Sequence, residues 1–198
     1  MASKPLPFNP DLEGRTAVVI GGGASLTRQD CEYAEQSGAV LIGVNNAFQI
    51  ADVDILYASD HPFIKKHWDA LRTIRGLVVT QIHANCKPID RDCFYVEGQH
   101  GTDMRSKRLS FGGNSGFAAV HLASLWGAGQ IVLLGFDMGV KDGKRHWFGD
   151  HPEGLRQPNN FGSWVSQFNG ANCPTPVVNC SRWTALECFP KSTIQEVL

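Results

Sequence analysis

The sequence lacks the features of several protein classes. No apolar run approaches the roughly 20 residues that a membrane-spanning helix needs, and the polar, proline-containing residues 1–10 have no apolar signal-peptide core. The formal net charge is only -1, so the cationic excess that supports general binding to nucleic acid is missing. We therefore expect a cytoplasmic protein with no membrane span and no general affinity for nucleic acid.

The cysteine pattern lacks the C-x-x-C spacing of zinc ribbons. In a cytosolic protein the simplest expectation is reduced thiols, several of them buried. Three disulfides in a secreted protein are the alternative, but residues 1–10 show no targeting sequence. The cysteines concerned are Cys31, Cys86, Cys93, Cys173, Cys180 and Cys188.

The 198 residues, 42% hydrophobic and 19% charged, suit one soluble globular domain. Strands alternating with helices predict an α/β fold, a Rossmann-like three-layer sandwich with a mainly parallel central sheet. We expect one nucleotide-binding domain over 1–198, with an irregular N-terminal arm at 1–14 and a loop and C-terminal cover at 140–198. Strands are predicted at 16–20, 40–44, 55–58, 77–80, 94–96, 130–135 and 176–181, and helices at 27–37, 63–71, 117–126 and 161–168.

The central feature is a β-branched run, residues 16–20, followed at once by Gly21, Gly22 and Gly23. Ser25 then suits the N-cap of a following helix. Glycines allow close approach of a ligand, and a helix start offers unpaired N–H groups with a positive dipole. The stretch therefore predicts an anion site for a nucleotide phosphate; the alternative is a tight turn with no ligand.

The glycine turn departs from two nucleotide-binding motifs. Leu26 stands where the dinucleotide fingerprint has its third glycine, and the second strand is followed by Asn45 and Asn46 rather than by an acidic residue. NAD and FAD are therefore disfavoured. The lysine motif of the P-loop is also missing, which argues against a P-loop ATPase.

Small, amide, hydroxyl and acidic residues recur after successive predicted strands. Because ligands of parallel sheets bind beyond the carboxyl ends of the strands, these residues predict one ligand site. Each alone is typical of a turn; their convergence favours a ligand. They are Gly21, Gly22, Gly23, Ser25, Asn45, Asn46, Ser59, Asp60, His61, Asn114, Ser115, Gly116 and Asp137.

Four blocks in this order, residues 21–26, 44–48, 114–116 and 134–137, resemble those of two related groups. One is glycosyltransferase family 42, bacterial sialyltransferases that use CMP-sialic acid. The other is domain of unknown function 115, similar to the archaeal 6-hydroxymethylpterin diphosphokinase, with many phage-encoded members. The resemblance implies a transferase with a CMP-type nucleotide donor, or with ATP and magnesium, in the cytoplasm of a host cell if phage-encoded.

The run from His146 to His151 is similar to the His-aromatic-aromatic-Gly-His run of the sialyltransferases. The resemblance implies that His151 is the general base that takes the proton of an acceptor hydroxyl, with His146 as its companion. The residues themselves leave two other hypotheses open: a metal site of His146, Asp150 and His151, or an exposed loop.

The diphosphokinase resemblance implies different chemistry, in which Asp60 and Asp137 hold magnesium between phosphates. Asp137 has the alternative of bracing a turn. A third hypothesis is a non-catalytic nucleotide-binding or structural protein. Segments 186–190 and 194–198 are expected to pack as a cover or as a contact in a homo-oligomer.

Overall fold

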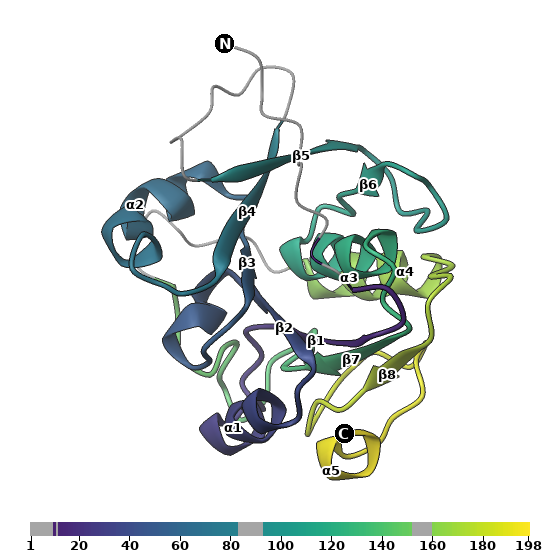
Figure 1. The fold of residues 1–198 in the computed structure, drawn as a ribbon. Helices are drawn as coiled ribbons and strands as arrows, with labels where there is room; N and C mark the ends of the chain where they lie inside the picture. Colours follow the sequence, from purple (N-terminus) through teal and green to yellow (C-terminus); the bar gives the residue numbers. More distant parts are fainter. Residues whose placement is uncertain (1–9, 11, 83–92, 152–159) are drawn as a thin grey trace.

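The computed structural model describes residues 10, 12–82, 93–151 and 160–198. Within them, eight strands form one sheet in the order β6-β5-β4-β3-β2-β1-β7-β8, and every neighbouring pair is parallel (Figure 1). The predicted α/β Rossmann-like fold is confirmed. The strands are β1 (Thr16–Ile20), β2 (Val40–Val44), β3 (Ile55–Tyr57), β4 (Leu77–Ile82), β5 (Phe94–Gln99), β6 (Leu109–Ser110), β7 (Gln130–Leu134) and β8 (Val177–Asn179).

Helices cover both faces of the sheet and make three layers (Figure 1). Successive residues of a strand point to opposite faces, so Val19 packs in one hydrophobic core and Val18 in the other. The first core includes residues of α3 (Ser115–Leu125) and α4 (Phe161–Asn169). The second includes residues of α1 (Arg28–Gln36), α2 (His61–Leu71) and α5 (Ile194–Val197).

The strand order changes direction at β1. From β1 the chain adds β2, β3, β4, β5 and β6 on one side, and then returns to place β7 and β8 on the other side. In open α/β sheets, the crevice outside the carboxyl ends of the strands at such a switch point is where ligands bind. The topology therefore places the candidate site where Gly21 follows β1 and Gly135 follows β7.

Several element boundaries differ from those predicted. Helix α3 begins at Ser115, two residues before the expected start, because Asn114 caps it by accepting the N–H of Phe117 at 3.1 Å. Strand β5 continues to Gln99, beyond the predicted 94–96. Strand β6 and the 3₁₀ helix η1 (Asn45–Gln49) were not predicted.

Parts of the two predicted terminal regions belong to the folded core. Leu12, near the end of the expected arm, is fully buried, and β8 within the expected cover is a strand of the central sheet. Of the cysteines in the described ranges, Cys31, Cys173, Cys180 and Cys188 are free thiols, and Cys31, Cys93 and Cys180 are buried; Cys86 lies outside those ranges. In this part of the chain no helix has the length and apolar content to cross a membrane.

Candidate functional site

A cavity of about 510 Å³ lies along the carboxyl edge of the sheet. This volume is within the range of small-molecule sites, roughly 300–1,000 Å³. Its wall brings together residues that follow β1, β2, β3 and β7 with the start of α3, as the sequence predicts. Of the predicted site residues, it is lined by Gly21, Gly22, Gly23, Asn45, Asn46, Ser59, Asp60, Asn114, Ser115, Gly116, Asp137, His146 and His151.

The three glycines have different roles. The N–H of Gly21 donates to the carbonyl of Leu134 at 2.7 Å, and that of Gly23 to the carbonyl of Gly135 at 2.8 Å. A Cβ on Gly21 or on Gly23 would stand 2.7 Å from the Gly135 oxygen. Both glycines therefore let the turn after β1 lie against the turn after β7. Gly22 faces the cavity, where an added Cβ would meet His146 and Phe148 at 3.3 and 3.8 Å.

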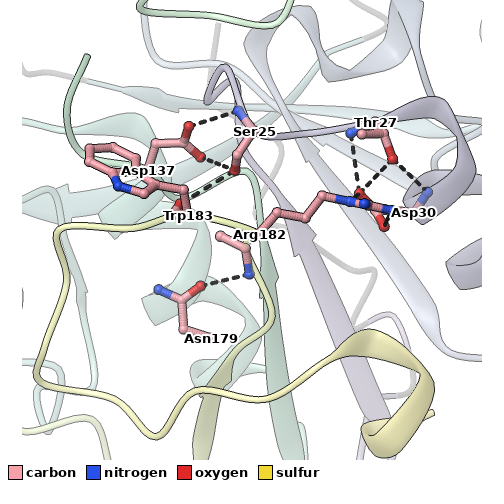
Figure 2. A network of polar contacts seen from close by, with 8 residues as sticks. Ser25, Thr27, Asp30, Asp137, Asn179, Arg182 and Trp183 are labelled. Carbon is pink, nitrogen blue, oxygen red and sulfur yellow. Dashed lines mark hydrogen bonds and ion pairs between the residues drawn. The ribbon is translucent and has the colours of Figure 1, made fainter. Parts of the chain in front are cut away.

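Ser25 does not serve the predicted role of an N-cap that cradles phosphate. Its N–H and its hydroxyl donate to the two carboxylate oxygens of Asp137, at 2.8 and 2.6 Å, across 112 residues of sequence (Figure 2). Asp137 is 1% exposed, and burial raises the pKa of its carboxyl group against the opposing effect of the Ser25 hydrogen bonds. The acidic side chain therefore occupies donors that the sequence assigns to a ligand anion.

Helix α1 begins within one residue of the predicted start, but its N-cap is not Ser25. Thr27 is its N-cap, and Thr27 and Asp30 form a reciprocal capping box. Asp30 also pairs with Arg182 at 2.8 and 2.9 Å (Figure 2). Burial raises the Asp30 pKa, but hydrogen bonds from Arg182 and Thr27 outweigh it and the net shift is downward. The start of α1 is thus satisfied by the protein, and none of these residues lines the described cavity wall.

The start of α3 meets the cavity. Asn114, Ser115 and Gly116 line the wall. The first N–H groups of a helix have no partner within it and carry the positive end of its dipole. The Ser115 hydroxyl is hydrogen-bonded to that of Ser59 at 2.7 Å, which ties this end of α3 to the end of β3. The helix start that lines the cavity is therefore that of α3, not that of α1 as the sequence predicted.

Two asparagines follow β2 in the cavity wall. Asn45 has a φ of 51°, a left-handed conformation that asparagine tolerates better than most residues. Asn46 is 6% exposed, and its side-chain oxygen is buried without a hydrogen-bond partner among the described residues. A buried acceptor with no partner costs about 1–3 kcal/mol. Asn46 also lines the cavity wall, so a ligand donor that reaches its amide would give this oxygen a partner.

The two predicted histidines contact each other and Phe148 in the cavity wall. Phe148 stacks on His146 with a ring-centroid distance of 4.9 Å, and His151 lies 4.8 Å from His146. His146 Nδ1 lies 3.1 Å from the carbonyl oxygen of Gly22, so the neutral ring donates its proton there. Burial lowers the pKa of both histidines, which favours neutral imidazoles at pH 7.

The acidic residues do not form a metal cluster. Asp60 and Asp137 both line the cavity, but the oxygens of Asp137 already accept from Ser25. Within the described ranges, no group of three or more His, Cys, Asp or Glu side chains is arranged to hold a metal ion. The hypothesis of a metal site at His146, Asp150 and His151 is therefore wrong for the structure as described.

The structure also adds residues that the sequence did not single out. Arg145 brings a positive charge to the wall, and Phe161 and Trp164 of α4 bring aromatic surface. Arg145 directly precedes His146, so its position next to the predicted run was a usable signal. Trp164 gave no such signal, because an aromatic residue at helical spacing is more often core than binding surface.

Comparisons with protein-family models, with curated proteins and with solved structures gave no match. The fold is that of an α/β protein of Rossmann-like architecture, with a cavity at its topological switch point. Its function has to be argued from the chemistry of that cavity.

Proposed function

We propose that the protein is a transferase that binds a nucleotide-activated donor, with a CMP-type nucleotide as in the sialyltransferases that its motifs resemble. The observation that carries the proposal is the convergence on one cavity of a helix start, an unpartnered buried amide oxygen and two histidines of lowered pKa. These groups suit a phosphate, a nucleoside and a proton transfer, respectively.

The phosphate is best accommodated at the start of α3. Ser115 and Gly116, the first residues of α3, line the cavity there, and Arg145 adds positive charge to the same cavity. The glycine turn is less suited to the phosphate, because Asp137 would bring a second negative charge beside it. Gly22 instead leaves room next to His146 for the body of the ligand.

The nucleoside is assigned to the asparagines after β2. The buried oxygen of Asn46 accepts a hydrogen bond, so it suits an amino group of a base or a hydroxyl of a ribose. A ligand donor at this position would satisfy an acceptor that the described protein leaves without a partner. This would convert a local cost in stability into binding energy.

His151 is assigned the role of general base. A neutral imidazole accepts a proton, and burial keeps the pKa of His151 below its usual value, so it is ready to do so at pH 7. In the proposed step, an acceptor hydroxyl gives its proton to His151 while its oxygen bonds to the anomeric carbon of the donor. The bond from that carbon to the phosphate oxygen breaks, and the electron pair leaves with the nucleotide.

A panel of nucleotides tests the proposal by thermal unfolding of the whole chain. CMP is expected to raise the melting temperature more than AMP or UMP, because a ligand that binds only the folded state stabilises it by mass action. His151→Asn should keep the rise in melting temperature with CMP, but it should release CMP from CMP-sialic acid about 100-fold more slowly than wild type. Stabilisation only by ATP with magnesium would favour the diphosphokinase function instead. If no nucleotide stabilises the protein, both the transferase and the diphosphokinase functions are refuted.

A further inference from the structure

One face of α4 carries aromatic residues from the core to the cavity. Phe161, Trp164 and Phe168 are spaced i, i+3 and i+7, which places them on one side of the helix. Phe168 is 2% exposed and packs against Phe117 and Phe136, with ring centroids 5.2 and 6.1 Å away. This contact fixes the helix, so the two aromatic residues that precede Phe168 are held rigidly where the core ends.

Phe161 and Trp164 continue this face along the cavity wall. Their rings meet edge to face, with centroids 5.5 Å apart and an interplanar angle of 85°. Both side chains are only partly buried. The pair is therefore an ordered aromatic surface that is open to a ligand, unlike Phe168 on the same face.

Asn160 adds a polar group beside the two rings. It occupies the N-cap position of α4, yet its side chain makes no capping hydrogen bond. It lines the cavity and is exposed. An amide that does not cap its own helix is available to donate to and accept from hydroxyl groups.

The cavity thus has a buried floor and an open rim with different chemistry. The floor holds Gly23 and Asn46, which are buried, whereas Phe161 and Trp164 lie at the partly exposed rim. A donor nucleotide bound at the floor leaves the rim for the second substrate.

We propose that the start of α4 is the acceptor subsite, and that the acceptor is a carbohydrate whose apolar ring face packs on Trp164 while its hydroxyl groups bond to Asn160. The assignment rests on the proposed transferase function. A pyranose has C–H groups on one face and hydroxyls at its edge, so an aromatic ring with an amide beside it matches both. The acceptor hydroxyl is then supplied to the cavity that His151 lines.

Saturation-transfer NMR on the full chain tests this subsite. The probes are methyl β-glucopyranoside, methyl β-galactopyranoside and methyl β-mannopyranoside, each with and without CMP, and glycerol provides hydroxyls without an apolar ring face. At least one glycoside should receive saturation on its ring C–H protons, and glycerol should not. Trp164→Ala should weaken that glycoside about tenfold, Trp164→Phe should restore part of the binding, and CMP binding should stay unchanged in both.

Trp126→Phe is the matched control, because Trp126 is the C-cap of α3, at the end of the helix opposite to the cavity, and does not line the wall as described. Binding of no glycoside, or equal binding to wild type and Trp164→Ala, would overturn the subsite and leave the nucleotide proposal standing. Loss of CMP binding in Trp164→Ala would also overturn it, because the rings would then hold the nucleobase. Glycoside binding by a protein that binds no nucleotide would refute the proposed function instead.

Discussion

Adding one methyl group to Gly23 should destabilise the protein far more than adding it to the neighbouring Gly22. A Cβ on Gly23 would stand 2.1 Å from Asp137 Oδ1 and 2.7 Å from the carbonyl oxygen of Gly135. Asp137 is buried and cannot move away without losing its bonds from Ser25. Gly23→Ala therefore breaks the contact that joins the turn after β1 to the turn after β7.

The magnitude follows from the two hydrogen bonds. Bonds to a charged group contribute about 1.5–3 kcal/mol each, so Gly23→Ala should cost about 3–6 kcal/mol of a total stability of about 5–15 kcal/mol. In Gly22→Ala the nearest atom to the new Cβ is His146 Nδ1 at 3.3 Å, which needs only a small shift. The lower entropy of the unfolded chain then offsets part of that cost, by about 0.4–1 kcal/mol.

Urea unfolding followed by circular dichroism measures this difference. With a slope of about 2 kcal/mol per molar urea, the Gly23→Ala midpoint should fall by about 1.5–3 M, and that of Gly22→Ala by less than about 0.5 M. A Gly23→Ala protein that is already unfolded without urea would agree with the upper part of this range. Equal midpoints for the two variants would refute the reasoning, because the Ser25–Asp137 contact would then contribute nothing measurable.

Three further predictions concern stability. Phe168→Ala should lower the free energy of unfolding by about 3–5 kcal/mol in urea titrations, because Phe168 joins α4 to the core; a loss below 1 kcal/mol would contradict this. Burial lowers the pKa of His121, whose Nδ1 accepts the Ser110 N–H at 2.9 Å. Its stabilising effect is therefore complete above the ordinary histidine pKa of 6.5 and is lost as the pH falls through the lowered value. His121→Asn, which keeps an acceptor, should lose less stability between pH 7 and pH 5 than wild type does. Parallel curves of the free energy of unfolding against pH would show that His121 does not cause this loss. Asn45→Gly should leave the melting temperature nearly unchanged, whereas Asn45→Ala should cost about 1 kcal/mol, because alanine disfavours a φ of 51°; the reverse order would contradict the backbone argument.

The fold was predictable where burial leaves a simple pattern. Strands β1 and β2 have the predicted bounds, because both faces of a parallel strand are buried and each apolar run is followed directly by glycine or asparagine. Strand β6 has only two residues, Leu109 and Ser110, which is too short for any periodic pattern to show.

The site was predictable as a set of residues but not as a set of roles. The rule that ligand residues follow strands predicted Asn46 and Ser115, and the resemblance of the run from His146 to His151 predicted the two histidines; all of them line one cavity. The rule gave no information on Ser25, because the residue that occupies its donors is 112 positions away. The sequence did not predict Trp164 at the cavity rim for a similar reason. Its place depends on how α4 packs on α3 through the contact of Phe168 with Phe117, which the local sequence does not reveal.

Calorimetric titration with CMP, of wild type and of Asn46→Ala, tests the central claim most directly. We predict saturable binding to wild type and at least about tenfold weaker binding to Asn46→Ala. The free energy of unfolding of Asn46→Ala should not fall by more than about 1 kcal/mol, because the lost oxygen has no described partner. Binding that is equal in the two proteins, or no heat of binding to wild type, would contradict the assignment of this cavity to a nucleotide.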